Sequence, residues 1–110
     1  MLISISHRVA GMALYAGLLI LAGWALALAS GPDAFDQYRG LLGSPLGKLV
    51  LFALTFAAFF HMANGVRHFF WDVGYGFEKR TADSTAVAVV AFAATASVAV
   101  WIIAFLAGLV

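Results

Sequence analysis

Residues 46–71 decide the fold of this chain, because they read LGKLVLFALTFAAFFHMANGVRHFFW and form one long apolar run. The run exceeds the ~20 residues that a helix needs to cross a bilayer. Its end carries an ionisable block, from His61 to Asp72, that contains two histidines, an arginine and an aspartate. Ionisable side chains at such a place are costly and usually functional, so we expect the chemistry of this protein in the block.

The composition is that of a membrane protein. Of 110 residues, 65% are hydrophobic and only 10% are charged, too few to cover a soluble domain of this length. We predict an all-α membrane protein, a single anchor domain over residues 1–110 with three transmembrane helices at about 3–29, 46–71 and 84–109. The third run is rich in small apolar residues, which predicts a role in helix packing.

Several functional classes are excluded by the residues that the chain lacks. It has no cysteine, which excludes thiolate-bound zinc, cysteine-bound iron–sulfur clusters, c-type haem attachment and disulfides. A redox cofactor held by this chain must therefore use histidine or methionine ligands. The net charge of +1 gives no sign of nucleic-acid binding.

The two connections predict where the helices start and which way they cross. Ser44 and Pro45 form an N-cap and a first helical residue for the second span, and Asp83 or Ser84 could cap the third. Both prolines fall within connection 30–45, which breaks the chain between two spans. Cations near span ends divide four to two: Arg8, Arg67, Lys79 and Arg80 on one side, Arg39 and Lys48 on the other. The larger group predicts a cytoplasmic N-terminus and second connection.

Helix phase places four residues of the block on one face. At about 100° per residue, that face holds His61, Gly65, His68 and Asp72. Gly65 lies one turn from His61, where a flat macrocycle could lie against the backbone. If the helix leaves the membrane near Val73, His61 lies roughly 18 Å from that end and His68 roughly 7 Å, at about 1.5 Å per residue. His61 thus suits an axial haem ligand, and His68 suits a propionate or outer partner.

Three residues of the block also have simpler interpretations. His61 could hydrogen-bond a carbonyl or hydroxyl group of a neighbouring helix, since polar side chains join helices in lipid. Arg67 points well away from the His61 face and could extend its guanidinium to the lipid headgroups. Asp72 could cap or solvate the helix end. The face shared by several polar residues favours a functional site over these alternatives.

The first span carries a second polar group near the same membrane surface. Ser4, His7, Arg8 and Gly11 occupy adjacent positions on one side of the helix. Ser4 and Arg8, at i and i+4, could donate together to a carbonyl oxygen, and His7 could pair with a carboxylate. Arg8 is also explained as a basic residue at a span end. Gly11 would allow another helix or a ligand to approach closely.

This chain is not expected to supply both ligands of one haem iron. His7 should lie too near the surface to meet His61 across an iron, and His68 shares a helix with His61. A six-coordinate haem therefore needs its second ligand from another chain, which predicts an obligate membrane partner. The three helices would then form half of a haem-binding bundle.

Three sequence motifs occur here together and resemble a known family. They are Ser4-Ile5-Ser6-His7-Arg8-Val9-Ala10-Gly11, His61-x-x-x-Gly65-x-Arg67-His68 and Trp71-Asp72-x-Gly74-Tyr75. Over essentially its whole length the chain resembles the cytochrome b556 family, whose members are membrane anchors of succinate dehydrogenase in respiratory complex II. Family members usually carry a polar segment before the first motif, whereas this sequence begins at Met1, three residues before Ser4.

The resemblance implies a cofactor and a substrate. The cofactor is haem b, with His61 as an axial ligand of the iron and the opposite ligand supplied by the sister membrane anchor. The remaining cofactor contacts would be His68, His7 and Arg8, joined by Gly65 on the geometry above. The substrate is ubiquinone, whose contacts would be Ser4, Arg8 and Asp72.

The resemblance also implies partners and a location. A flavoprotein and an iron–sulfur subunit would pass electrons from succinate to quinone, so the anchor alone would not be catalytic. The complex would lie in a bacterial inner (cytoplasmic) membrane, with the N-terminus of this chain cytoplasmic and the C-terminus on the opposite side. Two alternatives remain: a haem-free anchor that keeps the quinone site, and a non-catalytic assembly or scaffold protein.

Overall fold

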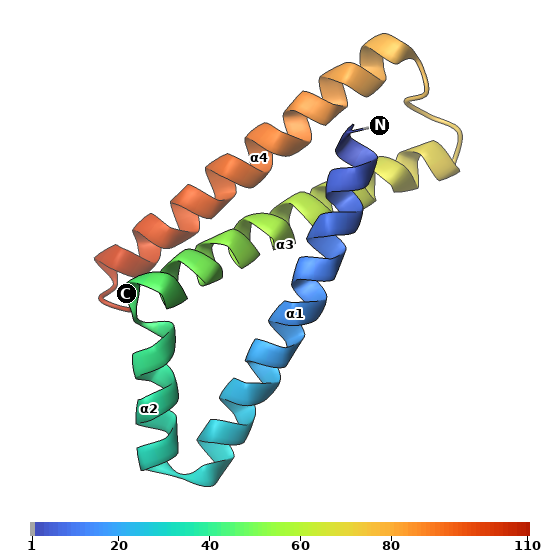
Figure 1. The fold of residues 1–110 in the computed structure, drawn as a ribbon. Coiled ribbons are helices and arrows are strands. Elements are labelled where there is room, and N and C mark those ends of the chain that lie inside the picture. The colour runs from blue at the N-terminus through green and yellow to red at the C-terminus, as the bar shows by residue number, and fades with distance from the viewer. Residues whose placement is uncertain (1) are drawn as a thin grey trace.

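The computed structural model describes residues 2–110, and those residues form four helices and no strand (Figure 1). The long ones are α1 (Leu2–Ser30), α3 (Pro45–Asp72) and α4 (Lys79–Leu106), with the short α2 (Pro32–Leu42) between α1 and α3. Each of the three long helices has the length and apolar composition to cross a membrane. The prediction of an all-helical protein with three such helices is confirmed.

The helices α3 and α4 run antiparallel beside each other, while α1 crosses α3 obliquely near the N-terminus (Figure 1). At the other end α1 and α3 diverge, and α2 closes the gap between them. The buried apolar residues lie where the three long helices meet: Ala10, Ala57, Phe60, Val89 and Ala93. Small side chains let the helices approach closely, as expected for packing in lipid, and most larger apolar side chains face outward.

The connection between the first two spans contains a helix that the sequence analysis did not predict. Gly31, with φ 117°, ends α1, and Pro32 begins α2 as its first residue. The Tyr38 hydroxyl donates to the carbonyl of Ile20, 2.5 Å away, and so fastens α2 to α1. A Cβ at Gly23 would lie 2.8 Å from that hydroxyl, so only glycine permits this contact. The connection therefore ends α1, as predicted. Its residues then form a new helix, α2, which packs against α1.

One of the two predicted helix caps is confirmed and the other is wrong. The Ser44 hydroxyl accepts from the Gly47 amide at 3.1 Å, as expected for an N-cap before Pro45. The helix α4 begins at Lys79 after Glu78, five residues before the predicted Ser84, so neither Asp83 nor Ser84 caps it. Polar residues mislead here, because the helix extends beyond its apolar part.

The predicted extension of Arg67 towards lipid headgroups is wrong. Its guanidinium donates to the Thr85 hydroxyl (3.0 Å), the Ala82 carbonyl (3.1 Å) and the Asn64 side-chain oxygen (3.2 Å). It also lies over the ring of Trp71, 4.1 Å from the centroid. Because the α3–α4 connection is short, the first turns of α4 present these acceptors beside α3. Arg67 therefore joins α3 to α4 inside the protein.

We expect Arg67→Met to lower the thermal unfolding midpoint of the assembled membrane complex. The variant loses three charge-assisted hydrogen bonds, which together contribute on the order of 2 kcal/mol or more. The matched control is Arg80→Met, which removes an exposed cation from α4. An equal fall in both variants would show that Arg67 contributes only as a surface charge.

Candidate functional site

Three histidines from two helices form one stack. The His7 ring on α1 is parallel to the His61 ring on α3, with 4.1 Å between centroids and 1° between planes. The His7 ring also stacks on the His68 ring, with 5.3 Å between centroids and 27° between planes. His7 thus touches both histidines of α3, and the expectation that it lies nearer the surface than His61 is wrong. The two rings are stacked directly on each other, so they do not face each other across an iron. The helix α1 crosses α3 obliquely near its own N-terminal end (Figure 1). The stacking of His7 on His61 shows that the first turns of α1 lie level with His61.

A hydrogen bond assigns different roles to the two ring nitrogens of His61. Its Nδ1 lies 3.3 Å from the backbone carbonyl of His7, and only a protonated Nδ1 can donate to it. In that tautomer Nε2 keeps its lone pair. This is the arrangement of many metal-binding histidines, whose other nitrogen donates to a carbonyl or carboxylate. It is also the interhelical hydrogen bond that the simpler interpretation of His61 predicts.

Two glycines flank His61, and only one of them contacts it. A Cβ at Gly11 would lie 3.1 Å from Cε1 of His61, so Gly11 is what lets the imidazole lie against α1. A Cβ at Gly65 would meet no atom within 4 Å. No packing contact within the described part of the chain requires a glycine at Gly65. The predicted close approach at Gly11 is confirmed.

Two buried ring nitrogens in the stack lack a partner. Within residues 2–110, neither Nδ1 of His7 nor Nε2 of His68 makes a hydrogen bond. A buried polar atom without a partner costs on the order of 1–3 kcal/mol, so such atoms usually point to a ligand or to water. A ring N–H would suit an anionic oxygen, such as the carboxylate of a haem propionate. The residues present therefore fit the implied cofactor.

A groove runs along α1 and α3 next to the stack. It has a volume of about 520 Å³, and Gly11, Leu14, Leu18 and Leu54 are among its lining residues. Since Leu54 lies two turns before His61 on the same face of α3, the groove continues the histidine stripe into the apolar part of the membrane. An apolar space beside an imidazole suits the flat, hydrophobic body of a macrocycle.

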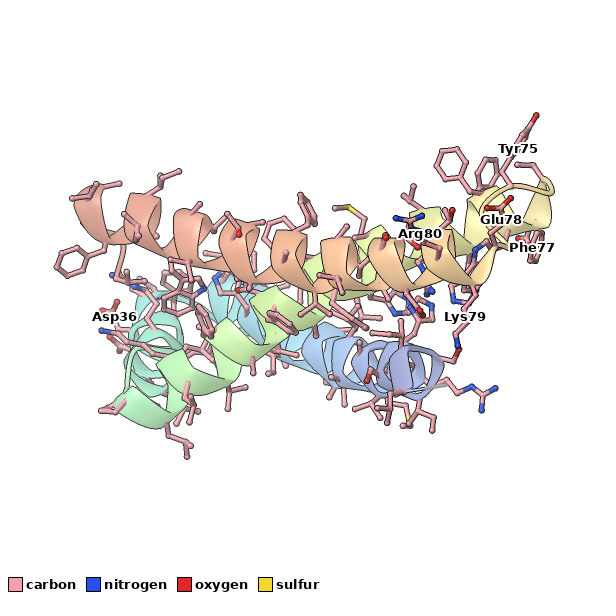
Figure 2. All side chains as sticks on the ribbon, turned by 90° about the horizontal axis from the view of Figure 1, so that it is seen from above. Asp36, Tyr75, Phe77, Glu78, Lys79 and Arg80 are labelled. Carbon is pink, nitrogen blue, oxygen red and sulfur yellow. The ribbon has the colours of Figure 1, made fainter. Side chains whose placement is uncertain are left out.

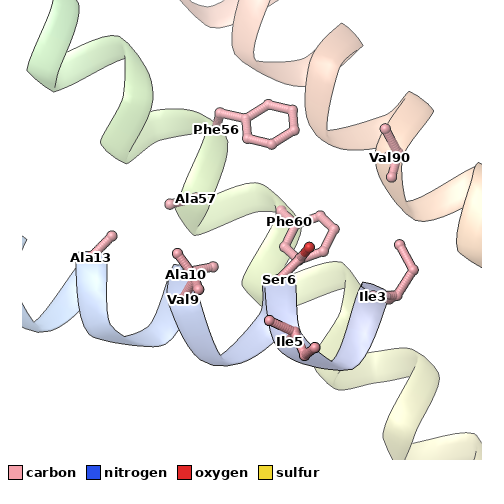
Figure 3. Close-up of a pocket in the computed structure, with 10 residues that line it drawn as sticks. All are labelled: Ile3, Ile5, Ser6, Val9, Ala10, Ala13, Phe56, Ala57, Phe60 and Val90. Atoms are coloured by element: carbon pink, nitrogen blue, oxygen red, sulfur yellow. The ribbon is translucent and has the colours of Figure 1, made fainter. Parts of the chain in front are cut away.

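A second groove lies on a different side of α1, against α3 and α4 (Figure 3). Its volume is about 460 Å³, and its lining includes Ser6, Phe56, Phe60 and Val90. None of the predicted site residues lines it. With Ser6 as the one polar side chain in the lining, it provides no acid, base or charged group for chemistry.

The predicted quinone contacts lie near the stack but are not joined to one another. Ser4 is half-buried, and Arg8 and Asp72 are exposed. No hydrogen bond links the side chains of these three within the described residues. The exposed aromatic and charged residues Tyr75, Phe77, Glu78, Lys79 and Arg80 gather at one end of the bundle, and Asp36 lies at the other (Figure 2).

Trp71 is a residue of the site that the sequence analysis treated only as part of a motif. Its ring meets His68 edge to face, with centroids 4.9 Å apart, and lies under the guanidinium of Arg67. The signal in the sequence was spacing. Trp71 follows His68 by three residues and Arg67 by four, and side chains at these separations are neighbours on a helix.

Residues 1–100 match the sequence model of the succinate dehydrogenase/fumarate reductase transmembrane subunit family. The chain belongs to this family. Among its relatives is the succinate dehydrogenase cytochrome b556 subunit of Rickettsia felis, 35% identical over 91% of this chain and 77% of the relative. The same subunit of Paracoccus denitrificans is 33% identical over 93% and 78%. The human mitochondrial succinate dehydrogenase cytochrome b560 subunit is 41% identical over 69% of this chain and 46% of the relative. The family resemblance inferred from the motifs is confirmed.

Proposed function

We propose that this chain is a membrane anchor of succinate:quinone oxidoreductase that holds one side of a haem b and part of a ubiquinone site. Membership of the family and the names of its relatives support the anchor role in complex II. The single observation that carries the haem site is the bond from His61 Nδ1 to the His7 carbonyl, which leaves Nε2 available as a ligand.

Each residue of the stack has its own part in this proposal. His61 binds the haem iron, while His7 and His68 present their unpartnered nitrogens to its propionates. Arg8 directly follows His7 on α1 and adds a positive charge that favours the anionic propionates. Gly65 leaves room for the macrocycle beside α3. When bound, haem b supplies a one-electron carrier next to the quinone site.

The quinone site is assigned to Ser4, Arg8 and Asp72. The hydroxyl and the guanidinium stand one turn apart on α1 and can donate to a quinone carbonyl oxygen. Asp72, one turn after His68 on α3, is exposed and can accept or relay a proton. In this chain Arg8 and Asp72 are exposed and Ser4 is half-buried, so we assign the rest of the enclosure to partner subunits.

The partners are assigned from the family and from the names of the relatives. A second membrane anchor supplies the other haem ligand, and a flavoprotein and an iron–sulfur subunit oxidise succinate and deliver electrons. We assign the complex to a bacterial inner membrane, with the N-terminus and the α3–α4 connection cytoplasmic. Lys79 and Arg80 lie at that end (Figure 2). Arg67 is hydrogen-bonded inside the protein, so we do not count it among the cations near span ends that set this orientation.

The test is to purify the complex through a tag on this chain, identify its subunits and record the reduced-minus-oxidised spectrum. We expect three partner subunits and a b-type absorption band. A complete complex without the band would favour the haem-free anchor, in which His61 only hydrogen-bonds His7. Recovery of the chain without the flavoprotein and iron–sulfur subunits would favour the scaffold interpretation.

Gly11→Ala is expected to lower the haem content of the purified complex at least about twofold, because a site tolerates displacement of its ligand by only about 0.5 Å. The added methyl would lie 3.1 Å from His61 Cε1 and push the imidazole away from α1. Gly40→Ala is the matched control, since its Cβ would meet no atom within 4 Å and Gly40 lies on α2, away from the stack. Similar haem content in both variants would contradict this role of Gly11.

A further inference from the structure

Trp71 stands between the histidine stack and the α3–α4 connection, and it touches both. On the side of the stack, its ring centroid lies 4.9 Å from that of His68, with 63° between the two planes. Its Nε1 donates to the Gly76 carbonyl at 2.9 Å, on the side of the connection. Phe77 lies nearly parallel to the indole, with centroids 6.3 Å apart.

The indole is held by restraints from three directions. Arg67 lies over its ring at 4.1 Å, and Arg67 is itself fixed by hydrogen bonds to Thr85 and Ala82 on α4. The connection is shaped to the ring, because Gly76 adopts φ 81° and a Cβ there would lie 3.4 Å from the indole Nε1 and Cδ1. A side chain held by a cation, a hydrogen bond and a close backbone has one orientation.

The His68 imidazole has no comparable restraint of its own. Its Nε2 is buried and makes no hydrogen bond in the described part of the chain. Its ring is bounded by His7 on one side and by Trp71 on another. Without the indole, the imidazole could turn to another of the staggered rotamers that its helical backbone allows.

We propose that Trp71 is a positioning residue of the cofactor site, which holds the His68 imidazole against His7 so that its ring N–H can donate to an anionic group of the cofactor. This rests on the proposed haem function. Arg67 and the Gly76 carbonyl set the orientation of Trp71, so the α3–α4 connection is linked through one indole to the histidine stack.

The expected readout is the haem midpoint potential, which a purely structural role of Trp71 would not move. A hydrogen-bond donor at a propionate lowers the effective negative charge beside the iron and favours the reduced form. Trp71→Phe keeps an aromatic ring but loses the Nε1–H bond and part of the contact with His68. At a fixed potential, we expect the ratio of reduced to oxidised haem to fall about threefold, which is about 28 mV at 59 mV per tenfold.

The experiment is a double-variant cycle on the purified complex, with a potentiometric titration of the b-type band. The four proteins are the wild type, Trp71→Phe, His68→Gln and the double variant. Trp101→Phe is the matched control, because its Nε1 also donates within the bundle, to the Thr55 hydroxyl at 3.1 Å. Thr55 lies about 20 Å along α3 from His68, at about 1.5 Å per residue. We expect Trp71→Phe to lower the potential in the wild-type background and to change nothing once His68 is replaced.

Several outcomes would overturn the proposal. It is wrong if the potential is unchanged or raised in Trp71→Phe, if the shift persists at full size in the His68→Gln background, or if Trp101→Phe produces the same shift. If Trp71→Phe binds no haem, Trp71→Tyr takes its place. Loss of haem from both, with Trp101→Phe normal, also overturns it, because a positioning role leaves ligation at His61 intact. Absence of a b-type band from the wild type would instead refute the proposed function.

Discussion

His61→Ala is expected to abolish the b-type absorption band of the purified complex while its subunits still assemble. The variant removes the nitrogen that we assign to the iron, and replacing even an outer partner of a metal ligand typically lowers affinity about 10–100-fold. Loss of the ligand itself should therefore lower haem content by at least about tenfold. The measurement is the reduced-minus-oxidised spectrum, normalised to the amount of flavoprotein.

The control for His61→Ala is Met62→Ala. Met62 is the next residue of α3 but is 55% exposed, so its loss leaves the stack unchanged. A band of normal height in His61→Ala would refute ligation and leave His61 with its hydrogen bond to the His7 carbonyl as its whole role. Partial recovery of the band by added imidazole would show that the missing group is the ligand and not the fold.

Arg8→Ala is expected to lower quinone reduction about ten- to a hundredfold, the value of one charge-assisted hydrogen bond of about 1.5–3 kcal/mol in the reaction. Succinate oxidation with an artificial electron acceptor should persist, because we assign those steps to the partner subunits. The two assays on one preparation separate a defect at the quinone from a defect in assembly.

The matched control for Arg8→Ala is Arg80→Ala. Arg80 is also an exposed cation at the N-terminal end of the bundle, but it lies on α4 beside the connection (Figure 2). If both substitutions lower quinone reduction equally, Arg8 acts only through the general positive charge of that surface. If Arg8→Ala lowers both activities together, it acts in assembly and its place in the quinone site is wrong.

Local features of the sequence predicted much of the fold and of the site. Apolar length predicted the three long helices, and the Ser44–Pro45 pair predicted the start of α3. Helix phase placed His61 and His68 on one face, because their separation along α3 depends only on the regular geometry of one helix. The family motifs rest on the same local order of residues.

Features that depend on two helices could not be predicted in this way. The start of α4 was placed too late because its first residues are polar, yet they continue the helix beside α3. Arg67 was placed at the headgroups because Thr85 and Ala82, 18 and 15 residues away in the chain, gave no sign in the sequence that they would accept its hydrogen bonds. The helix α2 was missed because its anchor is the Ile20 carbonyl on α1.

The sequence by itself determined which side chains share a face of one helix: His61 with His68 on α3, and Ser4 with Arg8 on α1. Only the tertiary structure decided that His7 stacks on His61 at 4.1 Å and also reaches His68. Position within a helix follows from the rise and turn of its own backbone, which local sequence dictates. The level at which two helices meet follows from their crossing, which is set by contacts such as Gly11 against His61 between residues far apart in the chain.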